Sequence, residues 1–332
     1  MKLTKRKPVL HLKFPHTPPP YDNGTALKIA TYNVNSIGSR LTNLLEWLER
    51  EAPDVACLQE LKAPDNRFPA AAVRNAGYGC IWHGQVSWNG VAILAKGVEP
   101  VEIRKGLPGD PDDTHSRYIE AEITGKGAAH GITVACLYLP NGNPQPGPKF
   151  DYKLKWFERL IAHAQVLYES KKPVVICGDF NVIPTDLDVY NPKSWKKDAL
   201  IQPETRAAYQ RLLAQGWTDA LRSLHPEERI YTFWDYFRNH WARDAGLRID
   251  HLLLNAAATK QLKDANVHRW VRGQPHASDH APTWVQLGEA SAPAPETKPA
   301  ASQAAPEPKA PKAKAPVMEV AAKSPRPRKR KS

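Results

Sequence analysis

The stretch PVVICGDFN, residues 173–181, decides the fold class because it joins a buried strand to a polar turn. Its apolar run from Val174 to Cys177 has the length of a strand, and Gly178-Asp179-Phe180-Asn181 ends that run. Similar apolar runs alternate along the chain with amphipathic stretches of helical periodicity. This alternation predicts α/β layers, with sheet inside and helices outside.

The predicted elements are short and numerous. Eight strands are expected at residues 28–34, 54–60, 90–96, 117–123, 132–140, 173–181, 248–255 and 282–288. Three helices are expected at residues 39–52, 151–171 and 203–216. In the first helix Leu41, Leu44, Leu45 and Leu48 fall at helical spacing, and Ser39 can cap its start. The third has Pro in its first turn and Gly just past its end.

Basic charge is concentrated at the two ends of the 332-residue chain. The net charge is +12, of which residues 1–27 carry +4 and residues 289–332 carry +6, leaving only +2 on residues 28–288. Both ends are rich in Pro and polar residues, so they cannot bury enough apolar surface to offset the entropy of ordering. We predict a disordered extension at 1–27, a folded domain at 28–288 and a disordered tail at 289–332. Basic ends favour a polyanionic partner, nucleic acid first and an anionic membrane surface second.

Cysteine usage and hydropathy exclude several classes of protein. Cys57, Cys80, Cys136 and Cys177 show no Cys-x-x-Cys spacing, and three of them lie in apolar strand runs. We read them as buried thiols of a reducing compartment, so disulfides and zinc are not expected. No run has the length of a membrane span, and no apolar signal-peptide segment follows the basic N-terminus. The sequence therefore predicts an intracellular protein without a membrane segment.

Polar residues gather where the predicted strands stop. They are Asn33, Asn35, Gln59, Glu60, Tyr138, Asn141, Asp179, Asn181 and Asp250, together with Asp279 and His280 in PHASDHAPTW, residues 275–284. Strand ends and the loops beyond them are where α/β proteins place their sites. Each residue alone also has an ordinary explanation as a turn, a cap, a packing residue or an ion-pair partner.

The combination favours metal-assisted chemistry. Several carboxylates with Asn oxygens form the hard-oxygen site that Mg²⁺ accepts. A neighbouring His can take a proton near neutral pH, and a second Asp can fix its tautomer. This set of carboxylates, Asn oxygens and a His is suited to hydrolysis of a phosphate ester.

Eight motifs in this order carry a family resemblance across residues 28–288: TYNVNSI, CLQELK, YLPNG, GDFNV, NPKSWKKDAL, YTFWDY, LRIDHLLL and SDHAPTW. Together they resemble the exonuclease III family of apurinic/apyrimidinic endonucleases, in its bacterial style, within the endonuclease/exonuclease/phosphatase superfamily. The N-V-N, Q-E, G-D-x-N and S-D-H motifs are shared with phosphatases of that superfamily. The NPKSWK, TFWDY and LRIDHLLL blocks point to the DNA-repair branch.

The resemblance implies a fold and an activity. The fold is a four-layered α/β sandwich, with two mixed β-sheets packed face to face and helices outside. The activity is Mg²⁺-dependent cleavage of the phosphodiester 5′ to abasic sites in duplex DNA, with 3′→5′ exonuclease and 3′-end-cleaning action; Mn²⁺ can replace Mg²⁺. The resemblance also implies a monomer in the bacterial cytoplasm, associated with the nucleoid. The terminal PRPRKRKS is similar to a nuclear-import signal, which is the lesser reading.

The resemblance also implies roles for ten residues. The metal ligands would be Asn33, Glu60, Asp179, Asn181 and Asp279. The catalytic residues would be Tyr138, Asp179, Asn181, Asp250 and His280, with Asp250 orienting His280 and Asp179 positioning or deprotonating the attacking water. The substrate-binding residues would be Asn141 and His280 at the phosphate and Trp234 in the pocket for the baseless sugar.

Three departures from the family pattern leave the balance of endonuclease and exonuclease action open. Asn35 stands where some members have Asp, Gly38 replaces an Arg, and the segment after Asn141 is Pro-rich. Two alternatives also stay open: another superfamily phosphoesterase acting on RNA, inositol phosphates or sphingomyelin, and a DNA-binding protein on an inactive hydrolase fold. The basic tail is expected to contact nucleic acid nonspecifically, so its deletion should raise KM and flatten the salt dependence of KM. A solubility tail or spacer is the alternative for this segment.

Overall fold

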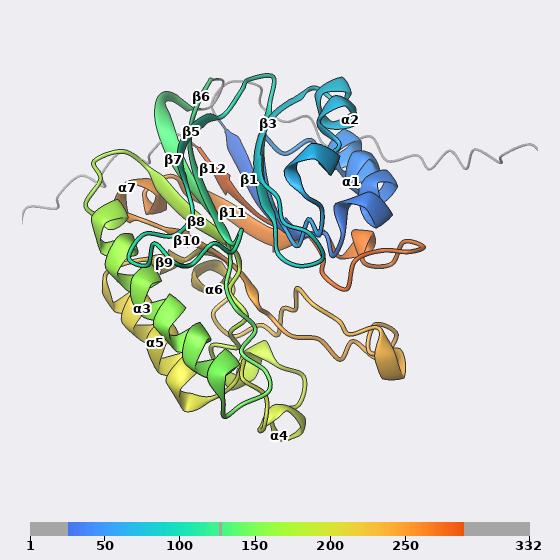
Figure 1. The fold of residues 1–332 in the computed structure, drawn as a ribbon, viewed down its shortest axis with the longest axis vertical. Coiled ribbons are helices and arrows are strands. Elements are labelled where there is room, and N and C mark those ends of the chain that lie inside the picture. The colour runs from blue at the N-terminus through green and yellow to red at the C-terminus, as the bar shows by residue number, and fades with distance from the viewer. Residues whose placement is uncertain (1–25, 126–127, 289–332) are drawn as a thin grey trace, which may run out of the picture. The chain divides into compact units, whose positions relative to one another are not determined.

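Two six-stranded sheets organise the computed structural model, which describes residues 26–125 and 128–288 (Figure 1). The first sheet has the strand order β11 (Leu262–Val267), β12 (Thr283–Leu287), β1 (Leu27–Asn33), β2 (Val55–Gln59), β4 (Val91–Lys96) and β3 (Tyr78–His83). The second has the order β5 (Val101–Lys105), β6 (Tyr118–Gly125), β7 (Ala128–Tyr138), β8 (Val174–Asp179), β10 (Asp250–Leu254) and β9 (Thr218–Asp219). Both sheets are mixed, since β1–β2 and β7–β8 are parallel pairs and their other pairs are antiparallel.

Helices cover the outer faces of both sheets, which gives the predicted four layers. Figure 1 shows α1 and α2 beside the first sheet and α3 and α5 beside the second. The helices are α1 (Ile37–Glu51), α2 (Ala70–Asn75), α3 (Pro148–Tyr168), α4 (Pro192–Trp195), α5 (Pro203–Ala214), α6 (Ala220–Leu224) and α7 (Ala256–Thr259). Short 3₁₀ turns lie at Asp65–Arg67, Asp186–Asp188, Phe237–Asn239 and Arg269–Val271. The α/β sandwich predicted from the family resemblance is confirmed.

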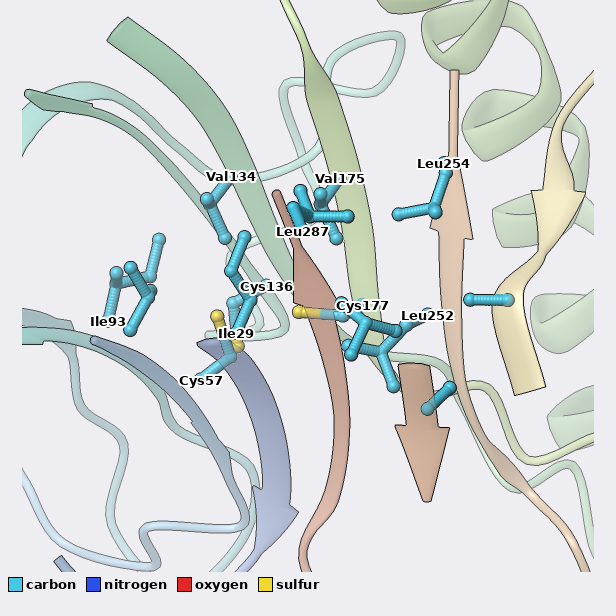
Figure 2. Packing of buried hydrophobic residues seen from close by; sticks show 14 of the residues in the cluster. Ile29, Cys57, Ile93, Val134, Cys136, Val175, Cys177, Leu252, Leu254 and Leu287 are labelled. Atoms are coloured by element: carbon cyan, nitrogen blue, oxygen red, sulfur yellow. The ribbon is translucent and has the colours of Figure 1, made fainter. Parts of the chain in front are cut away.

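The main apolar core lies between the two sheets, because alternate residues of each strand point to opposite faces. In β2, Val55 and Cys57 join the core between the sheets, while Ala56 and Leu58 pack on the side of α1. Figure 2 shows the side chains of Cys57, Cys136 and Cys177 within this inter-sheet core. The cysteines are free and buried, as the sequence predicted.

Some predicted boundaries were wrong. Helix α1 begins at Ile37, ahead of the expected cap Ser39, and its N-cap residue Ser36 makes no side-chain capping hydrogen bond. Strands β3, β5, β9 and β11 were missed. Strand β5 is exposed along its length, β9 has only two residues, and β11 carries polar residues at the edge of its sheet. The predicted strand 248–255 is confined to Asp250–Leu254.

The strand directions bring the predicted site residues to one edge of the sandwich. Parallel β1 and β2 end together at Asn33 and Gln59, and parallel β7 and β8 end together at Tyr138 and Asp179. Strand β10 runs antiparallel to β8, so its first residue, Asp250, lies opposite Asp179. Strand β12 runs antiparallel to β1, so the loop that precedes β12 reaches the same edge.

The predicted extensions at 1–27 and 289–332 fall outside the described residues, except for residues 26 and 27, and both stay predictions. Within the two described ranges, no helix is long and apolar enough to span a membrane.

Candidate active site

A cavity of about 300 Å³ opens at the edge where these strand ends meet. Its reactive wall is formed by Glu60, Tyr138, Asn141, Asp179, Asn181, Asp279 and His280. Its other lining residues include the largely apolar group Trp195, Leu200, Phe233, Leu247 and Ile249, with Asp198 beside them. Seven of the ten residues predicted from the sequence therefore line one cavity. Asn33 and Asp250 touch this set by hydrogen bonds, and only Trp234 lies apart.

Asn33 joins the two carboxylates at the centre of the site. Its Nδ2 donates to Glu60 Oε1 at 2.8 Å and to Asp179 Oδ2 at 3.0 Å. The other Glu60 oxygen pairs with Lys62 Nζ at 2.8 Å, and Lys62 also donates to Asn35 Oδ1 at 2.6 Å. Lys62 was not predicted as a site residue, although it ends the CLQELK motif. The cation at that position neutralises part of the charge that Glu60 brings.

His280 lies between two aspartates. Its Nδ1 is 2.8 Å from Asp250 Oδ2, and its Nε2 is 3.8 Å from Asp179 Oδ2. Although burial alone would lower the pKa of His280, the Asp250 carboxylate, helped by Asp179, raises it to about 10. Burial raises the pKa of Asp179, and the neighbouring carboxylates of Asp250 and Glu60 add to the effect while His280 opposes it. His280 is therefore a positively charged imidazole next to the carboxyl groups of Asp250 and Asp179.

The loop before β12 is held by hydrogen bonds to the first strand. Ser278 Oγ donates to the Asn33 carbonyl oxygen at 2.7 Å and accepts the His280 backbone N–H at 3.2 Å. Asp279 Oδ1 accepts from Asn35 Nδ2 at 3.0 Å. The turn chemistry of Ser-Asp-His thus fixes the positions of the two side chains that follow the serine.

Asn141 and Asn181 form a second polar group of the reactive wall, called the rim below. Asn141 Nδ2 donates to Asn181 Oδ1 at 3.1 Å, and Asn181 Nδ2 donates to the Leu139 carbonyl oxygen at 2.9 Å. The buried ammonium of Lys153 donates to the carbonyl oxygens of Pro140, Asn141 and Asn181, at 3.1, 3.1 and 2.6 Å. Lys153 was also missed, since it lies within the amphipathic pattern of α3 and no local motif marks it.

Several site residues adopt left-handed backbone conformations. The φ angles of Asn35, Glu60, Lys62 and Asn181 are 44°, 52°, 49° and 46°. Asn tolerates this region, but a Glu or a Lys there is uncommon. Such conformations persist where surrounding contacts impose them, which is common at functional sites.

The residues present fit a divalent cation. Glu60, Asp179 and His280 each offer one ligand atom, and these three atoms lie within 4.8 Å of one another. Carboxylate oxygens are the donors that hard cations such as Mg²⁺ take. The pKa of Asp179 is raised by burial first and then by the carboxylates of Asp250 and Glu60, and a bound cation would favour its ionised form. Because the raised pKa of His280 keeps both of its ring nitrogens protonated, the carboxylates are the better ligands.

Trp234 does not line the cavity, which corrects the sequence prediction. Its ring is fully buried, donates from Nε1 to Asp244 Oδ1 at 2.9 Å and packs edge-on against Trp241. Its neighbour Phe233 lines the cavity instead, edge-on to His280 at a centroid distance of 5.0 Å. Phe233 is bridged in β fashion to Leu247 and to His280, and in such an extended segment neighbouring side chains point opposite ways.

Comparison with known proteins agrees with this geometry. The model of the Endonuclease/Exonuclease/phosphatase family matches residues 30–280. Exodeoxyribonuclease III of Haemophilus influenzae is 34% identical over 269 residues, which cover 79% of this chain and all of that protein. The DNA repair nuclease APEX1 of Danio rerio is 32% identical over 267 residues, which cover 79% of this chain and 82% of that protein.

Solved structures show the same likeness. An AP endonuclease from Archaeoglobus fulgidus superposes with a TM-score of 0.74 at 37% identity, covering 79% of this chain and 99% of that one. The 3′-5′ exonuclease NExo from Neisseria meningitidis superposes with a TM-score of 0.75 at 38% identity, covering 79% of this chain and all of that one. A variant of NExo, described as a 3′ phosphatase, was solved bound to product DNA hairpin.

Fold, site and relatives define a hydrolase of the endonuclease/exonuclease/phosphatase family. Within that family, the chain belongs to the exonuclease III branch of DNA-repair nucleases.

Proposed function

We propose that this protein is a Mg²⁺-dependent nuclease that cuts duplex DNA 5′ to abasic sites and also trims or cleans 3′ ends. The observation that carries the proposal is the mixed lining of the cavity, in which the reactive wall and the apolar side chains of Trp195, Phe233, Leu247 and Ile249 border one space. A deoxyribose without its base presents apolar ring carbons to such a wall. The phosphate 5′ to that sugar would then meet the polar side.

The acids of the site would hold the metal ion. Glu60, Asp179 and Asp279 are the carboxylates that line the cavity near Asn33, and Asn181 adds an amide oxygen. When bound, Mg²⁺ would supply stabilisation of the charge that develops on the phosphate oxygens. Lys62, fixed between Glu60 and Asn35, would keep Glu60 oriented toward the cavity.

Proton transfer would fall to residues with perturbed pKa values. The raised pKa of Asp179 suits a group that takes a proton from the attacking water near neutral pH. His280 would donate from Nε2 to a phosphate oxygen, with Asp250 fixing the tautomer through Nδ1. Tyr138 keeps its proton, because burial and the charges of Glu60 and Asp179 raise its pKa, so its hydroxyl is a donor for the leaving oxygen. Asn141 would contact the phosphate from the rim.

The test is nicking of a duplex oligonucleotide that carries one abasic analogue, with Mg²⁺ and with EDTA. The wild type should cut 5′ to the analogue only with Mg²⁺, and His280→Asn should lose about 10³-fold in kcat. His115→Asn is the matched control, because His115 is half-exposed and hydrogen-bonds Asp113, which is not among the cavity residues. Failure of the folded wild type to nick would favour another phosphoester, and failure on every phosphoester would favour a binding protein on an inactive fold.

Three finer predictions accompany this function. They are the monomeric state, the cytoplasmic location and the contact of the basic tail with DNA. None of them alters the assignment of the residues.

A further inference from the structure

Arg117 lies against Tyr138, at the point where strand β7 ends in the reactive wall. The guanidinium carbon of Arg117 lies over the Tyr138 ring, 4.9 Å from its centroid. Arg117 Nη1 donates to the Tyr138 carbonyl oxygen at 3.2 Å, and the Tyr138 backbone N–H donates to the Arg117 carbonyl oxygen at 2.8 Å. Arg117 therefore holds Tyr138 at its ring and at both of its backbone polar groups.

A tyrosine of the outer helix α3 also contacts the guanidinium. The Tyr152 ring centroid is 6.0 Å from the guanidinium carbon of Arg117, and the Tyr152 hydroxyl donates to Asp113 Oδ1 at 3.0 Å. The other Asp113 oxygen accepts from Arg159 Nη1 at 2.7 Å. These contacts run from α3 to the reactive wall, and they fix the place of Arg117 between two aromatic rings.

The charge of Arg117 is not neutralised by a carboxylate. Across residues 26–125 and 128–288, Arg117 forms no ion pair, and its Nε is buried without a hydrogen-bond partner. Arg159, two contacts away, is instead paired with Asp113. A cation that is partly removed from water and left unpaired costs free energy, so a purely structural bridge would be expected to carry a carboxylate partner. The unpaired charge of Arg117 is directed at the Tyr138 ring.

The hydroxyl of Tyr138 lies on the cavity side, close to the carboxylates of Glu60 and Asp179. In the proposed reaction it serves the oxygen that leaves as the 3′-hydroxyl of the nucleotide before the abasic site. As the attacking water bonds to phosphorus, the bond from phosphorus to that oxygen breaks. The leaving oxygen takes up a proton through the Tyr138 hydroxyl, which is reprotonated from solvent.

We propose that Arg117 is a positioning residue for this step. It holds the Tyr138 ring so that the hydroxyl faces the leaving oxygen, and its charge over the ring stabilises the negative charge that develops there. The inference rests on the proposed function, since it assumes that Tyr138 serves the leaving oxygen. It assigns the role from the contacts of Arg117 with the ring and backbone of Tyr138.

The experiment compares two duplexes that carry one abasic analogue. In one the scissile phosphate has its ordinary 3′-oxygen, and in the other that bridging oxygen is replaced by sulfur. Sulfur leaves as a thiolate without a proton donor, because a thiol is far more acidic than an alcohol. Single-turnover nicking rates with Mg²⁺ are measured for both duplexes with each protein. Any effect of sulfur on the metal ion is common to all the proteins and cancels when the rate ratios are compared.

Arg117→Met should cut the oxygen duplex about tenfold more slowly than the wild type, because the Tyr138 hydroxyl is no longer held at the leaving oxygen. It should cut the sulfur duplex within about twofold of the wild-type rate. Arg117→Lys keeps a cation for the ring face and should stay within about threefold of the wild type on the oxygen duplex. In a Tyr138→Phe background, adding Arg117→Met should slow nicking less than about twofold further, since the two residues act as one unit.

Arg206→Met is the matched control. Arg206 also donates to a backbone carbonyl close to the site, that of Ile183 at 2.9 Å, and its other partner is Asp186. It should keep the wild-type ratio of the oxygen and sulfur rates, whatever the change in Tm. The two rates are read on one preparation of each variant, so partial unfolding does not alter their ratio.

Three results would overturn the inference: equal slowing of both duplexes by Arg117→Met, no slowing of either, or a lysine variant as slow as the methionine variant on the oxygen duplex. Each would leave Arg117 as a structural bridge while wild-type nicking upheld the proposed function. A wild type that nicks neither duplex would overturn the proposed function and this inference together.

Discussion

His280 and Asp250 meet in a buried hydrogen bond of 2.8 Å between His280 Nδ1 and Asp250 Oδ2. The aspartate starts β10 and the histidine precedes β12, so strands of different sheets supply the two partners. Asp250 Oδ1 is buried and has no hydrogen-bond partner in the described structure. The Asp250 carboxylate therefore has His280 as its side-chain partner. Because this hydrogen bond occupies Nδ1, Nε2 is the imidazole nitrogen left for the cavity.

Replacing Asp250 by Asn should disable the histidine while leaving substrate binding largely intact. An amide can hold the imidazole in the wrong tautomer, and it no longer stabilises the protonated ring. We expect kcat of nicking to fall about 10²-fold or more, with KM changed less than about threefold. Single-turnover nicking across substrate concentrations separates the two constants. Asp235→Asn, on the neighbouring loop, should behave as wild type, and an unchanged kcat in Asp250→Asn would remove the pair from the mechanism.

Glu60→Gln should weaken binding of the divalent ion. The introduced amide would keep the shape of the side chain but lose the anionic oxygen that faces Asp179 and His280. We expect the dissociation constant for Mn²⁺, measured by electron paramagnetic resonance of the free ion, to rise about tenfold to a hundredfold. Glu99→Gln, at the exposed ion pair with Arg74, is the control. Equal Mn²⁺ affinity in wild type and Glu60→Gln would show that the metal binds elsewhere.

Phe233→Ala should test the apolar wall of the cavity. Removing the ring that packs on His280 should lower kcat/KM for an abasic analogue about tenfold, and lower removal of a 3′ phosphate less, because the latter does not need the sugar wall. Trp234→Phe is the paired variant, since its ring points into the core and it should lose thermal stability while keeping this substrate ratio. A changed ratio in Trp234→Phe with none in Phe233→Ala would restore the original prediction for Trp234.

The contrast between Phe233 and Trp234 shows the limit of prediction from sequence. The motifs located Asn33, Glu60 and Asp179, because strand ends in parallel pairs converge at one edge of a sheet. They could not tell which of two adjacent aromatic rings faces the site. That depends on the register of an irregular extended segment, and a shift of one residue reverses every side chain.

Residues that support the site without lining the cavity were not predicted, for a related reason. Lys153 lies on α3 within an ordinary amphipathic pattern, and only tertiary packing brings its ammonium to the loops of Asn141 and Asn181. Long-range contacts of this kind leave no local signature.

Lys153→Met should disturb the positions of Asn141 and Asn181 in the site, because Lys153 holds the backbone of both residues. The buried carbonyl oxygens of Pro140 and Asn181 and the part-buried one of Asn141 would lose their donor, which costs about 1–3 kcal/mol for each buried group left unsatisfied. We expect a lower Tm and a fall in kcat that persists in the fraction that stays folded. Lys153→Arg, which keeps charge and donors, should recover more of kcat than of Tm, because Gly142 packs closely on the lysine chain. Normal kcat in folded Lys153→Met would limit the residue to a structural role.

The Glu51 carboxylate should make stability depend on pH through its contacts with His268 and Trp270. Its Oε2 is 3.0 Å from His268 Nε2, and its Oε1 accepts from Trp270 Nε1 at 2.8 Å. Burial alone would raise the pKa of Glu51, but these hydrogen bonds and the His268 charge outweigh it and lower the pKa from 4.5 to about 2. A depressed pKa means that the stabilisation is complete above pH 4.5 and is lost as the pH falls toward 2.

Glu51→Gln should therefore lower Tm by roughly 4 °C at pH 6, and this difference from wild type should shrink steadily between pH 4.5 and pH 2. Differential scanning calorimetry of both proteins across this pH range measures the Tm difference. The effects of the other acids that titrate in this range are common to both proteins and cancel in that difference. Glu46→Gln, an exposed change on the same helix, should give a small difference at every pH. A Tm difference for Glu51→Gln that stays constant with pH would mean that the carboxylate contributes packing alone.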